Sequence, residues 1–144
     1  MKSVSAVLRR KGAAAAVAAV SPSASVVDAL RMMAEKNIGS VVVMENDHYL
    51  GIMTERDYSR KVILKGKNSS DTTVGEIMSA DLPSVSPSDS IDHCMEIMSA
   101  ENIRYMPVFE GSELVGIISM SDVVKETILT QRETIEHLHS YIQS

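Results

Sequence analysis

An internal repeat constrains the fold of this chain more than any other feature of its sequence. Pro22 and Pro87 each stand in a Ser-Pro-Ser context 65 residues apart, and the same offset holds without a gap from position 20 to position 64. It aligns, among others, Ser25 with Ser90, Met33 with Met98, Gly51 with Gly116 and Asp57 with Asp122. With five residues inserted, the similarity extends upstream, because Val4, Val7 and Leu8 share their spacing with Val74, Ile77 and Met78. The sequence therefore predicts two copies of one supersecondary unit.

The first half of each repeat predicts a short strand followed by a helix. An apolar strand ends at Val20 or at Val85, and the Ser-Pro turn after it stops the strand. Ser25 and Ser90 then stand where helix N-caps are expected, and apolar residues follow them at helical spacing. We therefore expect one amphipathic helix after each turn.

The second half of each repeat predicts a hairpin and a second helix. Apolar runs at residues 41–44 and 50–53 flank a polar stretch, and residues 106–109 and 114–118 do the same in the second copy. The next helix begins at Thr54 or Ser119, and Gly66 is a natural C-cap for the first of them.

The fold class that follows is α+β, with the order β-α-β-β-α occurring twice. Repeat one covers residues 4–66, a polar linker covers 67–73, repeat two covers 74–130, and a helical tail covers 131–144. A unit of about 60 residues is marginal alone, so we expect the two repeats to pack together as a pseudo-twofold pair.

Composition excludes several classes of protein. The formal net charge of −5 disfavours a nucleic-acid binder, and no apolar run approaches the roughly 20 residues of a membrane span. The single cysteine, Cys94, cannot form an internal disulfide, and with four scattered histidines we expect no metal site. A soluble protein of the reducing cytoplasm fits best. The alternative of a secretory signal, suggested by basic residues before the apolar run 13–20, is disfavoured because that run belongs to repeat one.

The segments 51–57 and 116–122 are the most informative for function. Each delivers a hydroxyl residue, Thr54 or Ser119, to a helix start and places Asp57 or Asp122 three residues later. One interpretation is a capping box that satisfies the helix N-terminus. The other is a ligand site, because helix-start amides attract phosphate, a carboxylate accepts from ribose hydroxyls, and the glycine three residues before the hydroxyl leaves space for a ligand. The two interpretations are compatible.

The doubled Gly-hydrophobic-X-Ser/Thr-X-X-Asp pattern within tandem repeats resembles the cystathionine-β-synthase (CBS) domain pair, also called a Bateman module. The likeness extends from about Val4 to Thr130. Residues 37–43 and 102–108 look like that family's strand before the hairpin, and residues 54–61 resemble small stand-alone bacterial members.

The resemblance implies a cleft between the repeats that binds adenosine-containing ligands such as AMP, ADP, ATP, NAD or S-adenosylmethionine. Asp57 and Asp122 would then hold the ribose hydroxyls of two sites, and Thr54 and Ser119 would contact ribose or phosphate. The adenine would lie among apolar side chains near Val20, Ile38, Ile103, Met106 and Pro107.

Charge distinguishes the two repeats. Arg104 aligns with Gly39, and Arg56 aligns with Ser121. Arg56, Arg104 and Ser121 join the residues named above as the expected contacts of the ribose and phosphate. Arginine forks suit phosphate oxygens, so Arg56 and Arg104 are our candidates for the anionic part of the ligand, with Arg60 and Lys61 behind them. Tyr105 stands where relatives often carry histidine, a departure that concerns the phosphate contacts.

The carboxy-terminal tail predicts an amphipathic helix. Its apolar residues recur at intervals of three, four or seven and comprise Val124, Ile128, Ile135, Leu138 and Ile142. Such a stripe needs a partner. It either docks on its own module or, as we hypothesise, helps to build a homodimer.

These observations lead to one hypothesis with two alternatives. The chain is expected to be a non-catalytic regulatory module for adenine nucleotides that signals to a separate, unidentified effector protein, with no catalytic cofactor. The first alternative is a redox sensor that binds NAD or NADH. The second is a scaffold without a ligand, whose motifs only cap helices.

Overall fold

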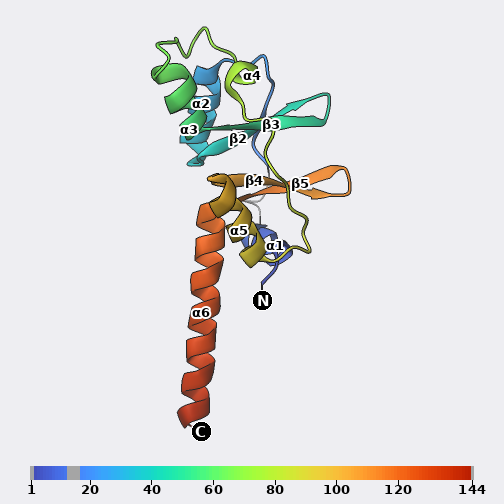
Figure 1. Cartoon of the computed structure of the whole chain (residues 1–144), viewed down its shortest axis with the longest axis vertical. Helices are drawn as coiled ribbons and strands as arrows, with labels where there is room; N and C mark the ends of the chain where they lie inside the picture. The colour runs from blue at the N-terminus through green and yellow to red at the C-terminus, as the bar shows by residue number, and fades with distance from the viewer. Residues whose placement is uncertain (1, 13–16, 144) are drawn as a thin grey trace. The chain divides into compact units, whose positions relative to one another are not determined.

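The computed structural model describes residues 2–12 and 17–143, and it divides the chain into two compact units (Figure 1). One unit is Val17–Leu82, and the other combines Met1–Ala16 with Pro83–Ser144. The compact units therefore do not follow the sequence repeats, because the first helix of the chain belongs to the unit that contains repeat two. The prediction that residues 13–16 belong to the first repeat lies outside the described residues.

The unit Val17–Leu82 is built on a three-stranded sheet of order β1-β2-β3. The strand β1 (Ala19–Val20) pairs in parallel with β2 (Ser40–Glu45), which pairs antiparallel with β3 (His48–Thr54). The helical segments of this unit are α2 (Val26–Lys36), α3 (Glu55–Tyr58), the wide π-helical turn η2 (Ser59–Ile63) and α4 (Val74–Ile77). The predicted strand–helix–hairpin–helix order is confirmed here.

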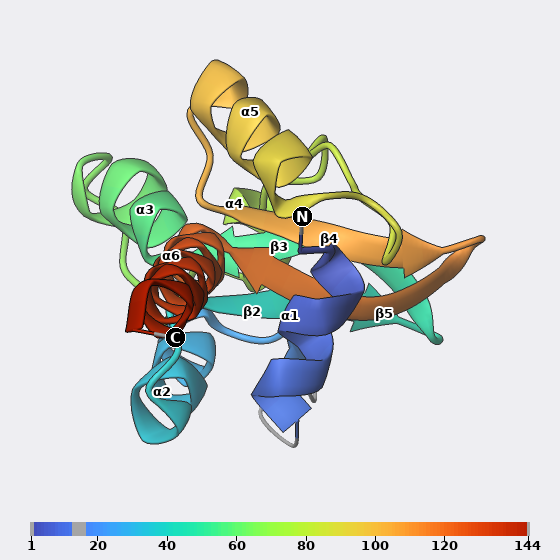
Figure 2. The same cartoon turned by 90° about the horizontal axis from the view of Figure 1, so that it is seen from below.

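The second unit is built on the hairpin of β4 (Tyr105–Glu110) and β5 (Glu113–Ser119). A parallel bridge from Val85 to Val108 takes the place of β1. The helices of this unit are α1 (Val4–Lys11), α5 (Ile91–Glu101) and α6 (Met120–Gln143). The helix α1 lies against β5 (Figure 2). The Leu8 side chain covers Gly116 there.

The helices α1 and α4 are exchanged between the repeats. Each precedes one repeat in sequence and packs on the other, so α1 contributes Val4 and Val7 to the core of Cys94 and Met98. Main-chain hydrogen bonds of the same kind fix both helices and join Val4 to Asp89, Ser5 to Pro87, Val74 to Ala24 and Gly75 to Pro22. The sequence pattern did not predict these two helices or their exchange.

Local capping explains where the two longer repeat helices begin and end. The Ser25 hydroxyl accepts from the Asp28 amide at 3.2 Å, and the Ser90 hydroxyl accepts from the His93 amide at 3.1 Å. Both helices end at an asparagine in the left-handed region, with φ of 53° at position 37 and 54° at position 102. The predicted N-caps are therefore confirmed.

The second helices of the two repeats differ in length. In repeat one, α3 passes into η2, and the chain turns at Gly66, which has a φ of 68°. In repeat two, α6 is a single helix of 24 residues that continues well past α1 and α5 (Figure 1). No helix among the described residues is long and apolar enough to cross a membrane. The C-terminal helix is confirmed, and the five apolar residues of the predicted stripe, Val124, Ile128, Ile135, Leu138 and Ile142, are exposed.

Candidate functional site

The first Thr-X-X-Asp motif forms a closed hydrogen-bonded cluster at the end of β3. Thr54 caps α3, its hydroxyl accepts from the Asp57 amide at 3.1 Å, and the Asp57 carboxylate accepts from the Thr54 amide at 2.9 Å. The Thr54 hydroxyl also donates to Asp57 Oδ2 at 3.0 Å. This is the capping box that the sequence suggested as one of two interpretations.

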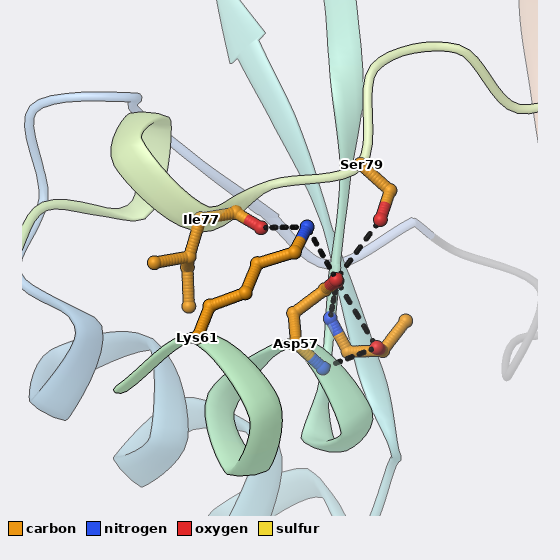
Figure 3. Close-up of polar contacts among 5 residues, drawn as sticks. Asp57, Lys61, Ile77 and Ser79 are labelled. Carbon is orange, nitrogen blue, oxygen red and sulfur yellow. Dashed lines mark hydrogen bonds and ion pairs between the residues drawn. The ribbon is translucent and has the colours of Figure 1, made fainter. Parts of the chain in front are cut away.

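Two further side chains hold the other oxygen of Asp57 (Figure 3). The Ser79 hydroxyl donates to Asp57 Oδ1 at 2.9 Å, and the Lys61 ammonium lies 3.0 Å from the same oxygen. Lys61 Nζ also donates to the Ile77 carbonyl at 2.9 Å. The buried Asp57 therefore joins α3, η2 and the segment after α4. Lys61, expected behind the phosphate, is instead the ion-pair partner of Asp57.

The second motif is built in the same way but has different neighbours. The Ser119 hydroxyl accepts from the Asp122 amide at 3.0 Å, and Asp122 Oδ2 accepts from the Ser119 amide at 2.9 Å. The cation beside Asp122 comes from α1, because Lys11 Nζ lies 3.0 Å from Oδ2 and also donates to the Ile117 carbonyl at 3.0 Å. The helix exchange thus places an α1 lysine at this motif.

The glycine of each motif makes room for protein atoms. A Cβ on Gly51 would lie 2.6 Å from the Ser79 carbonyl oxygen, and one on Gly116 would lie 2.9 Å from a methyl of Leu8. The expectation that these glycines leave space for a ligand is therefore not supported. Their role is the close approach of a chain segment or a side chain to the strand.

A pocket of about 460 Å³ lies beside the second motif. It reaches Ser119, the last residue of β5, and Ser121 on the first turn of α6, but not Asp122 itself. Its eight lining residues are Arg104, Tyr105, Ser119, Met120, Ser121, Val124, Lys125 and Ile128. Arg104 and Lys125 are both exposed, so the pocket combines two cations, the hydroxyl residues Ser119, Ser121 and Tyr105, and apolar side chains. The predicted residues Arg104, Ser119 and Ser121 are thus brought together.

The residues expected around the adenine are not all accessible. Met106 is fully buried in the core of its unit, and Pro107 is buried in β4, so neither side chain is available to a ligand in this structure. Ile103 is half-buried against the same core, and Val20 packs against the core of the other unit. Ile38 is exposed.

Three residues at these motifs escaped the sequence analysis. Lys11 and Ser79 come from segments outside the repeat motifs, and only the fold brings them to the two aspartates. Lys125 aligns with Arg60 at the repeat offset, which is the one signal that pointed to it. Arg56 is half-buried on α3 in the first motif.

The single cysteine of the chain, Cys94, is not poised to react as a nucleophile. Cys94 is buried on α5, and burial raises the pKa of its thiol to about 11. Among residues 2–12 and 17–143, no group of three or more His, Cys, Asp or Glu side chains is placed to hold a metal ion.

Comparison with known proteins identifies the family that this fold and these motifs define. The model of the CBS domain matches residues 7–63 and 74–128, so the chain belongs to the CBS domain family and has the α+β fold of a CBS pair. The resemblance seen in the sequence is confirmed.

Individual relatives agree. A solved structure from Burkholderia ambifaria, described as a signal-transduction protein with CBS domains, is 41% identical with a TM-score of 0.87, and the alignment covers 90% of this chain and 96% of that one. The mitochondrial CBS domain-containing protein CBSX3 of Arabidopsis thaliana is 37% identical over 83% of this chain, which spans 60% of that relative's length. The CBS pair of MJ0100, solved with 5′-methylthioadenosine and S-adenosyl-L-methionine, shares the fold at 22% identity and a TM-score of 0.76.

Proposed function

We propose that this chain is a non-catalytic regulatory module that binds an adenosine-containing nucleotide of the AMP, ADP or ATP class. The observation that carries the proposal is the pocket at the start of α6, which is lined by Arg104 and Lys125 together with Ser119 and Ser121. Two cations and the amides of a helix start form a favourable environment for phosphate. Asp122, hydrogen-bonded to Ser119, supplies a carboxylate for ribose hydroxyls.

The ligand class is supported by the family. Adenosine is the part shared by the two ligands of the MJ0100 pair. The non-catalytic role is supported by the chemistry of the second motif, because hydroxyls and a carboxylate that cap a helix bind a ligand without supplying a nucleophile with its own base. Turnover of a nucleotide incubated with the pure protein would contradict this role.

A second candidate ligand is NAD or NADH, which would make the protein a redox sensor. The pocket is consistent with it, because two cations suit a pyrophosphate as well as a single phosphate. Tighter binding of NADH than of ADP would select this alternative.

A thermal-shift experiment tests the proposal. The protein is melted with AMP, ADP, ATP, NAD, NADH and S-adenosylmethionine, beside the variants Arg104→Ala and Arg31→Ala. A ligand at 100 times its Kd adds about 2.7 kcal/mol, which raises Tm by several degrees for a chain of this size. Arg104→Ala should reduce the shift. Arg31→Ala is the control, because Arg31 pairs with Asp28 on the exposed face of α2. If no nucleotide shifts the wild type, the motifs act only as helix caps and the scaffold alternative holds.

The partner proposed for the α6 stripe is a second copy of this chain. Ile135, Leu138 and Ile142 are 65%, 55% and 80% exposed and follow the three-and-four spacing that pairs helices into coiled coils. Light scattering should give a dimer mass for the wild type and a monomer mass for Leu138→Lys, with Glu136→Lys as the control on the same helix. A monomeric wild type at micromolar concentration would refute the homodimer.

The signal is proposed to pass to a separate effector protein. A ligand shifts the equilibrium between two states of the chain only by its differential affinity for them, and the effector would respond to that shift. A reducing compartment such as the cytoplasm is proposed from the buried free thiol of Cys94.

A further inference from the structure

The two motifs look alike in sequence, but their carboxylates differ in how much hydrogen-bonding capacity remains. An ionised carboxylate offers about four acceptor positions. Asp57 accepts four contacts, from the Thr54 amide, the Thr54 hydroxyl, the Ser79 hydroxyl and the Lys61 ammonium. Its capacity is therefore used entirely by the protein.

Asp122 has capacity left. Its Oδ2 accepts from the Ser119 amide and from Lys11, and within residues 2–12 and 17–143 its Oδ1 accepts no hydrogen bond. About two acceptor positions therefore remain. A ribose with free 2′ and 3′ hydroxyls presents two neighbouring donors, which matches that number.

The hydroxyl residues differ in the same direction. The Thr54 proton is already donated to Asp57 Oδ2. The Ser119 oxygen accepts from the Asp122 amide, and its proton is given to no group in the described part of the chain. Ser119 also lines the pocket, so a ligand there would lie beside this residue.

Exposure separates the motifs further. The Asp57 side chain is 7% exposed, whereas that of Asp122 is 18% exposed. A ligand at Asp57 would have to displace Lys61, which also holds the Ile77 carbonyl, and Ser79 at the same time. Those intramolecular partners are already positioned and lose little entropy when they bind, so they compete strongly with a dissolved ligand.

We infer that each chain binds one nucleotide, through Ser119 and Asp122 of the second motif, and that Asp57 is a structural tie. This inference rests on the proposed function and specifies which of the two motifs carries it. The second motif binds the ribose, and the pocket lined by Arg104 and Lys125 takes the anionic end. The first motif holds α3, η2 and the segment after α4 together.

Isothermal titration calorimetry with ADP as the probe tests this assignment, using the matched variants Asp57→Asn and Asp122→Asn. The wild type should bind one ADP per chain. Asp122→Asn should weaken binding by about tenfold or more, the effect of impairing a hydrogen bond to a charged acceptor. Asp57→Asn should keep the stoichiometry, hold Kd within about threefold and lower Tm.

Two outcomes would overturn the assignment: two ADP molecules bound per wild-type chain, or loss of binding in Asp57→Asn with retention in Asp122→Asn. The wild-type stoichiometry decides the question even if Asp57→Asn does not fold. If the wild type binds none of ADP, AMP, ATP or NAD, the proposed function itself fails, and the one-site assignment falls with it.

Discussion

The ion pair between Arg10 and Glu126 offers the sharpest test of how the exchanged helix α1 is held. Arg10 Nε lies 2.8 Å from Glu126 Oε2, and a second guanidinium nitrogen donates to Oε1 at 3.0 Å. The Glu126 side chain is 1% exposed, whereas that of Arg10 is 42% exposed. The pair joins α1 to α6 across 116 positions of sequence. We predict that Arg10→Met will destabilise the fold strongly.

The size of the predicted destabilisation follows from the burial of the Glu126 carboxylate. Removing one partner of a fully buried ion pair costs about 3–5 kcal/mol, because the other charge is left without compensation. Arg10 is partly exposed and water can reach its position, so we expect about 2–3 kcal/mol for Arg10→Met. Glu126→Met should cost about 1–2 kcal/mol, because the guanidinium that remains can be hydrated. The double variant removes both charges and should cost about 1 kcal/mol or less.

Urea unfolding followed by far-UV circular dichroism measures these free energies, since the chain has no tryptophan for fluorescence. The double-mutant cycle should give a coupling of about 2–4 kcal/mol. Lys2 and Glu133 provide the control pair, which lies 3.7 Å apart with exposed fractions of 36% and 57%. Lys2→Met should change the free energy of unfolding by about 0.5 kcal/mol or less. The reasoning is refuted if Arg10→Met is as mild as the control, or if the two single effects simply add.

Three further predictions test the motifs and the titratable groups. Gly51→Ala should cost about 2–4 kcal/mol in urea unfolding and Gly116→Ala about 1 kcal/mol, because the new Cβ meets a backbone carbonyl in one case and a movable leucine methyl in the other; equal costs would contradict this. Burial raises the pKa of Cys94 from 9.0 to about 11, so the contribution of the neutral thiol to stability is full below pH 9 and is lost as pH rises towards 11. Iodoacetamide at pH 8 should label Cys94 at least about tenfold faster in urea than in the folded state. Hydrogen bonds from the Thr73 amide and hydroxyl lower the pKa of Glu76. The stability that they contribute is present above the ordinary pKa of Glu76 and is lost as pH falls through the lowered value. Thr73→Ala should raise the pKa of Glu76 in an NMR titration, and an unchanged pKa would count against a contribution from the hydroxyl.

The local parts of this fold could be predicted from sequence because their causes are local. Ser25 and Ser90 are recognisable N-caps, and the hairpin turn at Asn46 and Asp47 has φ angles of 52° and 64°, which polar turn residues of this kind tolerate. Apolar runs and helical spacing placed the strands and the longer helices. These signals extend over only a few residues, so each one holds independently of the rest of the fold.

The exchange of α1 and α4 could not be predicted in this way, because it depends on which distant surface each helix covers. The sequence contained one trace of it, the shared spacing of Val4 and Val7 with Val74 and Ile77. That spacing shows the two segments to be equivalent. It does not indicate which repeat each one packs on, since both repeats offer an apolar face of the same pattern.

The difference between the two aspartates has a cause that is visible in the sequence once the fold is known. Four residues after Asp57 stands Lys61, one helical turn away and able to reach its carboxylate. The same position after Asp122 is Glu126, so the charge there is reversed, and the cation that contacts Asp122 in the structure comes from α1 instead of α6. Both acidic residues instead take their cations from α1, with Lys11 on Asp122 and Arg10 on Glu126.

A second difference between the repeats lies in the upstream segment that aligns residues 4–8 with residues 74–78. Ser79, which donates to Asp57, is equivalent to Arg9, and Arg9 is exposed and makes no hydrogen bond to Asp122 in the described structure. The second carboxylate therefore lacks the serine donor that helps to saturate the first, and the cation beside it contacts Oδ2 alone. One reversed charge and one missing hydroxyl leave Oδ1 of Asp122 without a hydrogen-bond donor in the described part of the chain, and the proposed one-site assignment rests on this difference. A motif match alone thus predicts two equivalent sites, whereas the partners from outside the motif show that the two carboxylates are not equivalent.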